Sequence, residues 1–246
     1  MLVRLILIFF IFFMSIKNCV SNSIYASKIN KAIELSENFV NMNLDSLNYL
    51  NSLYSYLNKK YDCNIYTTDV YKQEYMLKYL DFSNILNFDT TEYINIIDSL
   101  LIYDKISAKI IISLNCNSYL NDNIYKLITD SINYDDYYDI THTYFSIMYI
   151  YNTYNGVLFR DKKLEKVLIN KMENIINSEN NSIDIKLEAI TFLGLFNNIK
   201  YINTNLDFIL NSQQLDGSWK FEESKDAILH TTLFGLWSLC ILKTNN

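Results

Sequence analysis

Apolar residues recur at three- and four-residue steps along nearly the whole chain after residue 27. In one such stripe, Leu164, Leu168 and Ile175 fall on a single helical face. The chain also contains no proline, the residue that interrupts helices and marks many turns. A period of three to four residues is typical of helices, because it returns each apolar side chain to the same side. The sequence therefore predicts an all-α fold.

Clusters of Asn, Asp and Ser divide this pattern into segments. They lie near residues 62–69, 115–123, 133–139, 155–162, 177–184 and 197–205. Because these residue types favour turns and helix ends over helix interiors, the clusters divide the chain into roughly ten helices. The amphipathic segment 162–177 is predicted to be an outer helix.

Three apolar segments read alike and indicate an internal repeat. They are DITHTYFSIMYI from Asp139, LEAITFLGLF from Leu187 and LHTTLFGLWSL from Leu229. Aligning the small residues of the last two places Ala189 opposite His230, and the spacings of 41 to 47 residues match one helix pair with its turns. Each segment is apolar almost all round, as expected for an inner helix. The repeat predicts antiparallel helix pairs stacked as an open solenoid or a closed ring.

The N-terminus, MLVRLILIFFIFFMSIKNCVSNS, resembles a secretory signal. Arg4 precedes an unbroken apolar run over residues 5–14, and small and polar residues follow. That run is too short to span a bilayer. We therefore expect a signal peptide over residues 1–22, a single helical domain over residues 23–246, and export. Membrane attachment is expected only if the signal segment stays uncleaved.

The charge distribution argues against a nucleic-acid partner. The formal net charge is −6, and acidic and basic residues are interspersed along the chain. No cluster of Lys and Arg is present that could follow a phosphate backbone. The partner is thus expected to be another kind of ligand or a protein.

Three cysteines follow the signal segment: Cys63, Cys116 and Cys240. Their wide spacing contains no CxxC pair. One disulfide between Cys63 and Cys116 fits an oxidising compartment, and the odd count then leaves one thiol over. The alternative is that all three act as small apolar residues, as expected for Cys240 in its apolar run.

The segment from residue 205 to residue 243 resembles the QW repeat of squalene cyclases and related α/α-toroid proteins. The resemblance rests on Gln213, Gly217 and Trp219 and on the following DAILHTTLFGLWSL, which resembles an inner helix of that superfamily. It implies a partial or complete α/α toroid. It also implies that these three residues form a structural clasp, with the glutamine amide reaching a neighbouring helix end and the tryptophan ring packing over it.

The same superfamily includes the protein prenyltransferase β-subunits, which hold zinc with an aspartate, a cysteine two residues later and a histidine. His230, four residues after Asp226, stands in a similar context. However, Asp62 lies directly beside Cys63, and the DxDD string with which squalene cyclases protonate their substrate is absent. The resemblance therefore supplies only part of a zinc ligand set.

The two histidines of the chain are the strongest site candidates. His142 follows Asp139 and His230 follows Asp226, each at the start of a predicted inner helix. An imidazole in a first helical turn tends to stay neutral, and the aspartate before it could cap the helix or orient the ring. Two such units, with Glu188 between them, could bind a metal or act as acid and base across a shared cavity. The alternative is that the aspartates are helix caps and the histidines are buried structural residues.

Two weaker signals lie beside His142. The string DDYYD over residues 135–139 matches a magnesium-diphosphate motif, but no second acidic site accompanies it. Tyr137, Tyr138 and Tyr144 lie nearby in the sequence, and tyrosine and histidine are the proton-transfer groups of secreted α/α-barrel polysaccharide lyases. We therefore expect a protein that binds a ligand or partner in a central cavity. The alternatives are an enzyme acting on carbohydrate or lipid, or on another substrate with the help of a metal, and, last, a relative of the prenyltransferases or terpene cyclases.

Overall fold

The computed structural model describes residues 25–46, 50–66, 109–110, 113, 122–153, 160–220 and 224–245. Within these ranges the protein is helical, and the one β-type pairing is an isolated bridge between Gln213 and Trp219. The predicted all-α class is confirmed. The predicted signal peptide lies outside the described residues.

The first described helix covers residues 25–41. The elements after it are η1 (Leu44–Ser46), α2 (Asn51–Tyr61), α6 (Asp122–Thr129), α7 (Tyr137–Thr153), α8 (Lys162–Asn177), α9 (Ile183–Phe196), α10 (Lys200–Thr204), α11 (Leu206–Ser212) and α12 (Lys225–Asn245). The predicted outer helix 162–177 coincides with α8, which buries Leu168, Met172 and Ile175. The predicted break near residues 197–205 is interrupted by the short helix α10.

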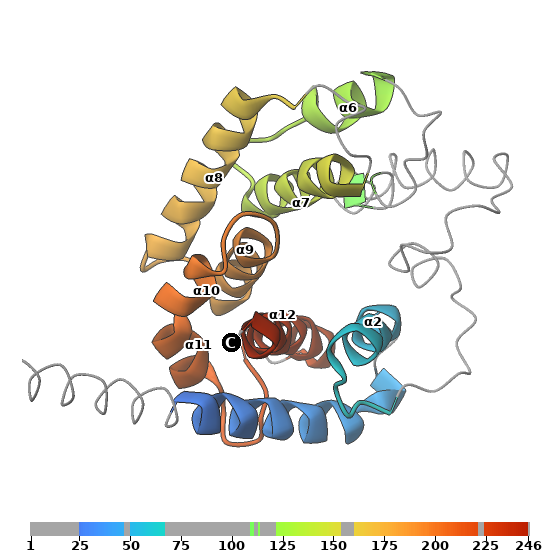
Figure 1. The fold of residues 1–246 in the computed structure, drawn as a ribbon, viewed down its shortest axis with the longest axis vertical. Coiled ribbons are helices and arrows are strands. Elements are labelled where there is room, and N and C mark those ends of the chain that lie inside the picture. The colour runs from blue at the N-terminus through green and yellow to red at the C-terminus, as the bar shows by residue number, and fades with distance from the viewer. Residues whose placement is uncertain are drawn as a thin grey trace, which may run out of the picture.

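The helices form two layers (Figure 1). An inner row consists of α7, α9, α12 and α2. An outer set, made of α6, α8, α10, α11 and the helix over residues 25–41, follows the top, left and lower edges of the view. Helices α7, α9 and α12 are buried on more than one side, because they pack against one another and against the outer set. In α9, for example, every residue from Leu187 to Gly194 is buried.

Three inner helices run in the same direction. Near their N-terminal ends, Asp184 of α9 accepts hydrogen bonds from Tyr138 of α7 and Thr231 of α12. Further along, the hydroxyl oxygens of Thr191 in α9 and Ser238 in α12 lie 2.8 Å apart. These contacting pairs are 46 or 47 residues apart in the sequence. Since α7 and α9 are parallel, α8 returns the chain between them.

The register between α9 and α12 differs from the one that the small residues predict. His230 lies level with Asp184, 46 residues earlier, and not with Ala189. The alignment on small residues gives the wrong register because the two aligned glycines make different contacts. Gly194 makes room for a side chain of α10, whereas Gly235 makes room for one in the turn before α12.

Helix α2 packs against α12 on the side away from α9 (Figure 1). The Tyr54 hydroxyl donates a 2.6 Å hydrogen bond to the Leu229 carbonyl near the start of α12. About two turns later, the indole nitrogen of Trp237 lies 3.4 Å from the Tyr61 hydroxyl. The first and last inner helices of the described chain are therefore parallel neighbours.

Helix α12 contains the one stretch of the described residues that is long and apolar enough to cross a membrane. That stretch is Ala227–Asn245, and 72% of it is buried inside the protein. Burial against α9 and α2 accounts for its apolar character, as in the core helix of a globular fold.

Side chains that lie just before the helices start them. Asp161 caps α8 by accepting hydrogen bonds from two amides of its first turn, and Ser182 caps α9 by accepting one, from the Ile185 amide at 3.5 Å. At α7 the cap is Asp136, which accepts from the amides of Tyr138 and Asp139 at 3.0 and 3.2 Å. The interpretation of Asp139 as the cap of this helix is therefore wrong, because α7 begins two residues before it.

The turn between α11 and α12 is clasped onto the helix over residues 25–41. The Gln213 amide nitrogen donates to the Ala32 carbonyl at 2.8 Å and to the Ser36 hydroxyl at 2.9 Å, so it reaches the middle of that helix and not its end. Gly217 adopts φ = 91°, and a Cβ there would lie 2.1 Å from the Leu35 carbonyl oxygen. Only glycine combines this conformation with so close an approach.

Trp219 completes the clasp. Its indole nitrogen donates to the Ile209 carbonyl at 2.8 Å, and its amide donates to the Thr232 hydroxyl at 3.1 Å. The ring is fully buried and lies against Gly235, where a Cβ would come within 2.5 Å of it. Trp219 therefore ties α11 to α12.

The cysteines do not follow the predicted pairing. Cys63, just after α2, has its sulfur 3.2 Å from that of Cys240 in α12. Cys116 lies outside the described residues. Both thiols are free and buried, so Cys240 is a core residue as expected. The parallel packing of α2 and α12 brings it into contact with Cys63, 177 residues earlier.

Candidate functional site

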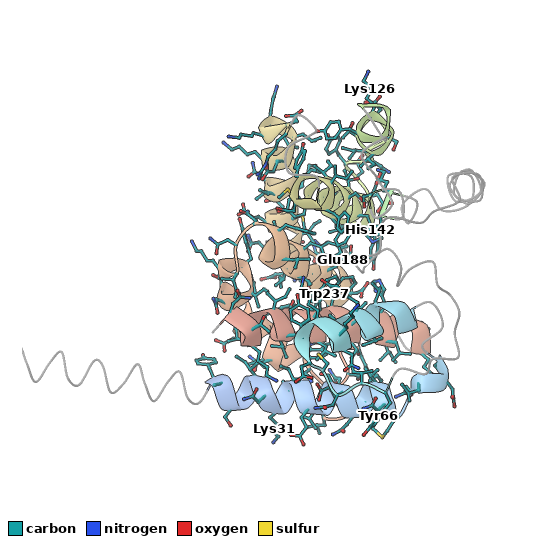
Figure 2. The ribbon with its side chains drawn as sticks, turned by 45° about the vertical axis from the view of Figure 1, so that its right-hand side comes forward. Lys31, Tyr66, Lys126, His142, Glu188 and Trp237 are labelled. Atoms are coloured by element: carbon teal, nitrogen blue, oxygen red, sulfur yellow. The ribbon has the colours of Figure 1, made fainter. Side chains whose placement is uncertain are left out.

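A group of ionisable side chains lies where the N-terminal halves of α7, α9 and α12 meet. We call it the imidazole–carboxylate cluster, and it consists of Tyr138, His142, Asp184, Glu188 and His230. Each residue lies within the first two turns of its helix. Figure 2 shows His142 of α7 directly above Glu188 of α9. The cluster thus depends on three parallel helices that start at the same level.

Asp184 is the centre of one half of the cluster. Its Oδ1 lies 3.0 Å from His230 Nδ1 and accepts a 2.8 Å hydrogen bond from the Thr231 hydroxyl. Its Oδ2 accepts a 2.5 Å hydrogen bond from the Tyr138 hydroxyl. Three donors from two neighbouring helices therefore surround this one carboxylate.

These contacts shift the protonation equilibria of both partners. Burial alone would raise the pKa of Asp184, but hydrogen bonds from His230, Tyr138 and Thr231 and the charge of His230 lower it below its usual value. Burial alone would lower the pKa of His230, but the hydrogen bond and charge of Asp184, with the charge of Glu188, raise it. The geometry therefore favours an imidazolium–carboxylate pair.

Glu188 forms the other half of the cluster. Its side chain is fully buried, and its Oε1 lies 3.3 Å from His142 Nε2 and accepts a hydrogen bond from the Thr141 hydroxyl. The other carboxylate oxygen, Oε2, is buried without a hydrogen-bond partner, and so is His142 Nδ1. Buried polar atoms are rarely left unpaired, because each one costs about 1–3 kcal/mol.

The two halves belong to one site. Asp184 and Glu188 are four residues apart on α9, so their side chains lie on the same face of the helix, one turn apart. The side chain of His142 is 15% exposed and that of His230 is 24% exposed, so both imidazoles reach solvent from a buried base. Aromatic rings flank them, with Tyr138 edge-on to His142 and Phe234 edge-on to His230.

The structure brings together three of the five residues proposed from the sequence. His142, His230 and Glu188 lie in the cluster. Asp139 does not, because its carboxylate pairs with Lys109, 30 residues earlier, and accepts a hydrogen bond from the Asn133 amide at 2.7 Å. The side chain of Asp226 lies outside the described residues.

Asp184 is the member of the cluster that sequence reasoning missed. It follows Tyr138 by 46 residues and precedes His230 by 46, the same interval that separates His142 from Glu188. A repeat of 46 residues would have placed Asp184 beside Tyr138 and His230. The alignment on small residues, with its interval of 41, did not show this.

The neighbouring tyrosines and acidic residues also divide into members of the cluster and residues that make other contacts. Tyr138 belongs to the cluster, whereas Tyr137 is exposed and Tyr144 is buried against Phe196. In DDYYD, Asp136 caps α7 while Asp139 faces Lys109, so these carboxylates have separate structural uses. They do not form the shared face that a magnesium-diphosphate site needs.

The donor set of the described residues does not fit a resident zinc ion. Among the described residues, no three His, Cys, Asp or Glu side chains group so that they could hold one metal ion. Each imidazole in the cluster has one carboxylate partner, and Cys63 lies beside Cys240 at the α2–α12 contact. A structural zinc site needs four ligands, and a catalytic site needs three.

A half-open cavity of about 420 Å³ lies at the opposite end of α9, between the end of α8 and α10. Amide side chains dominate its lining, and the Tyr201 hydroxyl there donates to Glu173 at 2.7 Å. No residue of the imidazole–carboxylate cluster lines it, so the cavity and the cluster are separate features. Comparison of the chain with protein-family profiles, curated proteins and solved structures finds no match.

Proposed function

We propose that this chain is an exported α/α-toroid-like protein that binds a hydroxyl-rich ligand, of the carbohydrate class, at the imidazole–carboxylate cluster. Export rests on the signal-like residues 1–22. The toroid rests on the parallel inner helices, on lateral contacts spaced by 46 or 47 residues, and on the packing of α2 against α12. In this arrangement the cluster lies at the rim formed by the N-terminal ends of the inner helices.

The observation that carries the ligand proposal is the pair of unpartnered buried atoms, His142 Nδ1 and Glu188 Oε2. When His142 Nε2 donates its proton to Glu188, Nδ1 is a hydrogen-bond acceptor, as Oε2 is. Two unpaired acceptors on one contacting side-chain pair favour a ligand that offers donors. Hydroxyl groups of a sugar supply several donors in fixed geometry, and the flanking Tyr138 and Phe234 rings offer apolar surface to its C–H faces.

A second candidate function is acid–base catalysis on such a ligand. It is favoured by the linked chain from the Tyr138 hydroxyl through Asp184 to His230, whose raised pKa keeps a proton on the imidazole. His142 beside Glu188 would then be the proton acceptor. Proton transfer between two imidazoles on one ligand needs no resident metal ion.

The chain offers a direct test because it contains two histidines. The ¹H–¹³C spectrum of the imidazole Hε1 groups has two signals, which the variants His142→Gln and His230→Gln assign. Neutral oligosaccharides of glucose, xylose and N-acetylglucosamine are titrated separately. We expect at least one of them to shift the His142 signal, because the ligand donates to Nδ1 of that ring.

Spermidine serves as the matched donor that carries ammonium groups in place of hydroxyls, and Asp139→Asn serves as the control variant outside the cluster. Binding that survives in Asp139→Asn but is lost in Glu188→Gln, with unchanged far-ultraviolet circular dichroism, supports the proposal. A response to spermidine alone refutes the hydroxyl class, and no response to any probe refutes the site. Release of new reducing ends, lost in His230→Gln while binding persists, would favour the catalytic alternative.

A further inference from the structure

Two cysteines that are far apart in the sequence meet where α2 packs against α12. The sulfurs of Cys63 and Cys240 lie 3.2 Å apart. Both residues are buried, with 5% and 2% of their surface exposed. They are the two cysteines within the described residues, and both are free thiols in this structure.

The surrounding contacts hold these two positions together. Tyr54 and Tyr61 of α2 reach Leu229 and Trp237 of α12, so the helices stay in register up to the cysteines. Helix α2 ends at Tyr61, and its C-cap Asp62 adopts a left-handed conformation with φ = 55°, which ends the helix directly before Cys63.

The residue after Cys63 is also anchored. The Asn64 amide donates a 2.9 Å hydrogen bond to the Glu37 carboxylate, which belongs to the helix over residues 25–41. The backbone is therefore fixed on both sides of Cys63, by the helix C-cap at Asp62 and by this hydrogen bond.

We propose that Cys63 and Cys240 are a disulfide site, oxidised when the protein folds in the presence of a small or protein disulfide such as oxidised glutathione. The thiolate of one cysteine attacks the oxidant, forming a mixed disulfide and releasing one reduced thiol. The second thiolate then attacks the protein sulfur of the mixed disulfide and releases the second reduced thiol. The two cysteines lose two electrons and two protons, and the oxidant is reduced to two thiols.

Oxidation precedes the final packing of α2 on α12. In the folded protein, both sulfurs are buried, and the pKa of Cys240 is raised by its contact with Cys63 and by burial, which disfavours the reactive thiolate. The bond should therefore form rapidly during refolding and slowly in protein that has folded in the reduced state.

The bond would join the first and last inner helices and thereby close a loop of almost the whole described chain. Since cross-linking positions 177 residues apart removes much chain entropy from the unfolded state, the oxidised form should melt roughly 10–20 °C above the reduced form.

Peptide mapping tests the proposal on the full chain. The protein is refolded with oxidised and reduced glutathione, alkylated in denaturant without reductant, and digested with trypsin. Cleavage after Lys and Arg leaves Cys19 in peptide 18–28, Cys63 in peptide 61–72, Cys116 in peptide 110–126 and Cys240 in peptide 226–243, so each peptide holds one cysteine. We expect peptides 61–72 and 226–243 to be recovered linked, and peptides 18–28 and 110–126 to be alkylated.

A thermal measurement gives a second readout. Reduction should lower the melting temperature of the wild type and of the control Cys116→Ala by the same amount, and should leave Cys63→Ala unchanged. Recovery of both peptides in alkylated form overturns the proposal, as does a link from 61–72 to 110–126. Because the mapping needs only the wild-type chain, a variant that fails to fold does not affect the result.

Discussion

Gly217→Ala probes the clasp most directly. At φ = 91° an alanine is strained, and its Cβ would lie 2.1 Å from the Leu35 carbonyl oxygen and 2.4 Å from the Leu35 carbonyl carbon. Both atoms belong to backbone inside a helix, which cannot rotate away as a side chain can. The turn must therefore move off the helix over residues 25–41 by more than an ångström to restore ordinary contact distances.

This displacement sets the expected cost. A non-glycine residue in a left-handed conformation costs about 1–2 kcal/mol. Retreat of the turn also stretches the two bonds that Gln213 donates to Ala32 and Ser36, at 2.8 and 2.9 Å, beyond hydrogen-bonding range. At about 1 kcal/mol for each bond, the free energy of unfolding should fall by about 3–4 kcal/mol. The melting temperature should fall by roughly 6–16 °C.

Urea unfolding followed by circular dichroism at 222 nm measures this change. Leu215→Ala is the matched control, because Leu215 lies in the same turn and is 100% exposed. It should change the free energy of unfolding by less than about 0.5 kcal/mol. If Gly217→Ala proves as stable as this control, the close approach between the turn and the helix is refuted.

Two further predictions concern the inner helices. The native pKa of His230 lies above 6.5, so its pairing with Asp184 stabilises the fold fully below that pH and is lost as pH rises through the native value. The native pKa of Asp184 lies below 3.8, so its contribution is present above that pH and is lost as pH falls through the native value. The stability difference between wild type and His230→Gln should therefore be largest between pH 3.8 and 6.5, and a difference independent of pH in urea titrations would contradict the pairing. Gly194→Ala should lower the free energy of unfolding by about 1–3 kcal/mol, because its Cβ would meet the Ile202 side chain at 2.4 Å. The double variant with Ile202→Val should recover part of that stability in the same urea measurement.

Much of the secondary structure could be predicted from the sequence. The stripe over residues 162–177 became α8, and the polar clusters fell close to helix ends at α2, α8 and α9. Local patterns suffice here, because helix periodicity and capping involve residues only three or four positions apart. The Asp139 cap was misassigned because Asp135, Asp136 and Asp139 are equally good caps by type, and only the backbone shows which one precedes the first helical turn.

The candidate site could be predicted only in part. His142 and His230 stood out because the chain has no other histidine, and Glu188 because its segment lies between theirs. Their partners did not stand out. The sequence offered an aspartate about one turn before each histidine as either a helix cap or a partner that orients the ring, whereas both histidines pair with carboxylates of α9, 46 residues away.

The amino-acid sequence by itself determined that this chain forms helices, where most of them end, and which of them are apolar enough to lie inside. These properties follow from interactions within one or two turns. The tertiary structure alone decided that Asp184 belongs to the site and that Cys63 lies against Cys240. Both contacts depend on the lateral register of parallel helices, which is set by side-chain packing across 46 to 177 residues of sequence and leaves no local pattern.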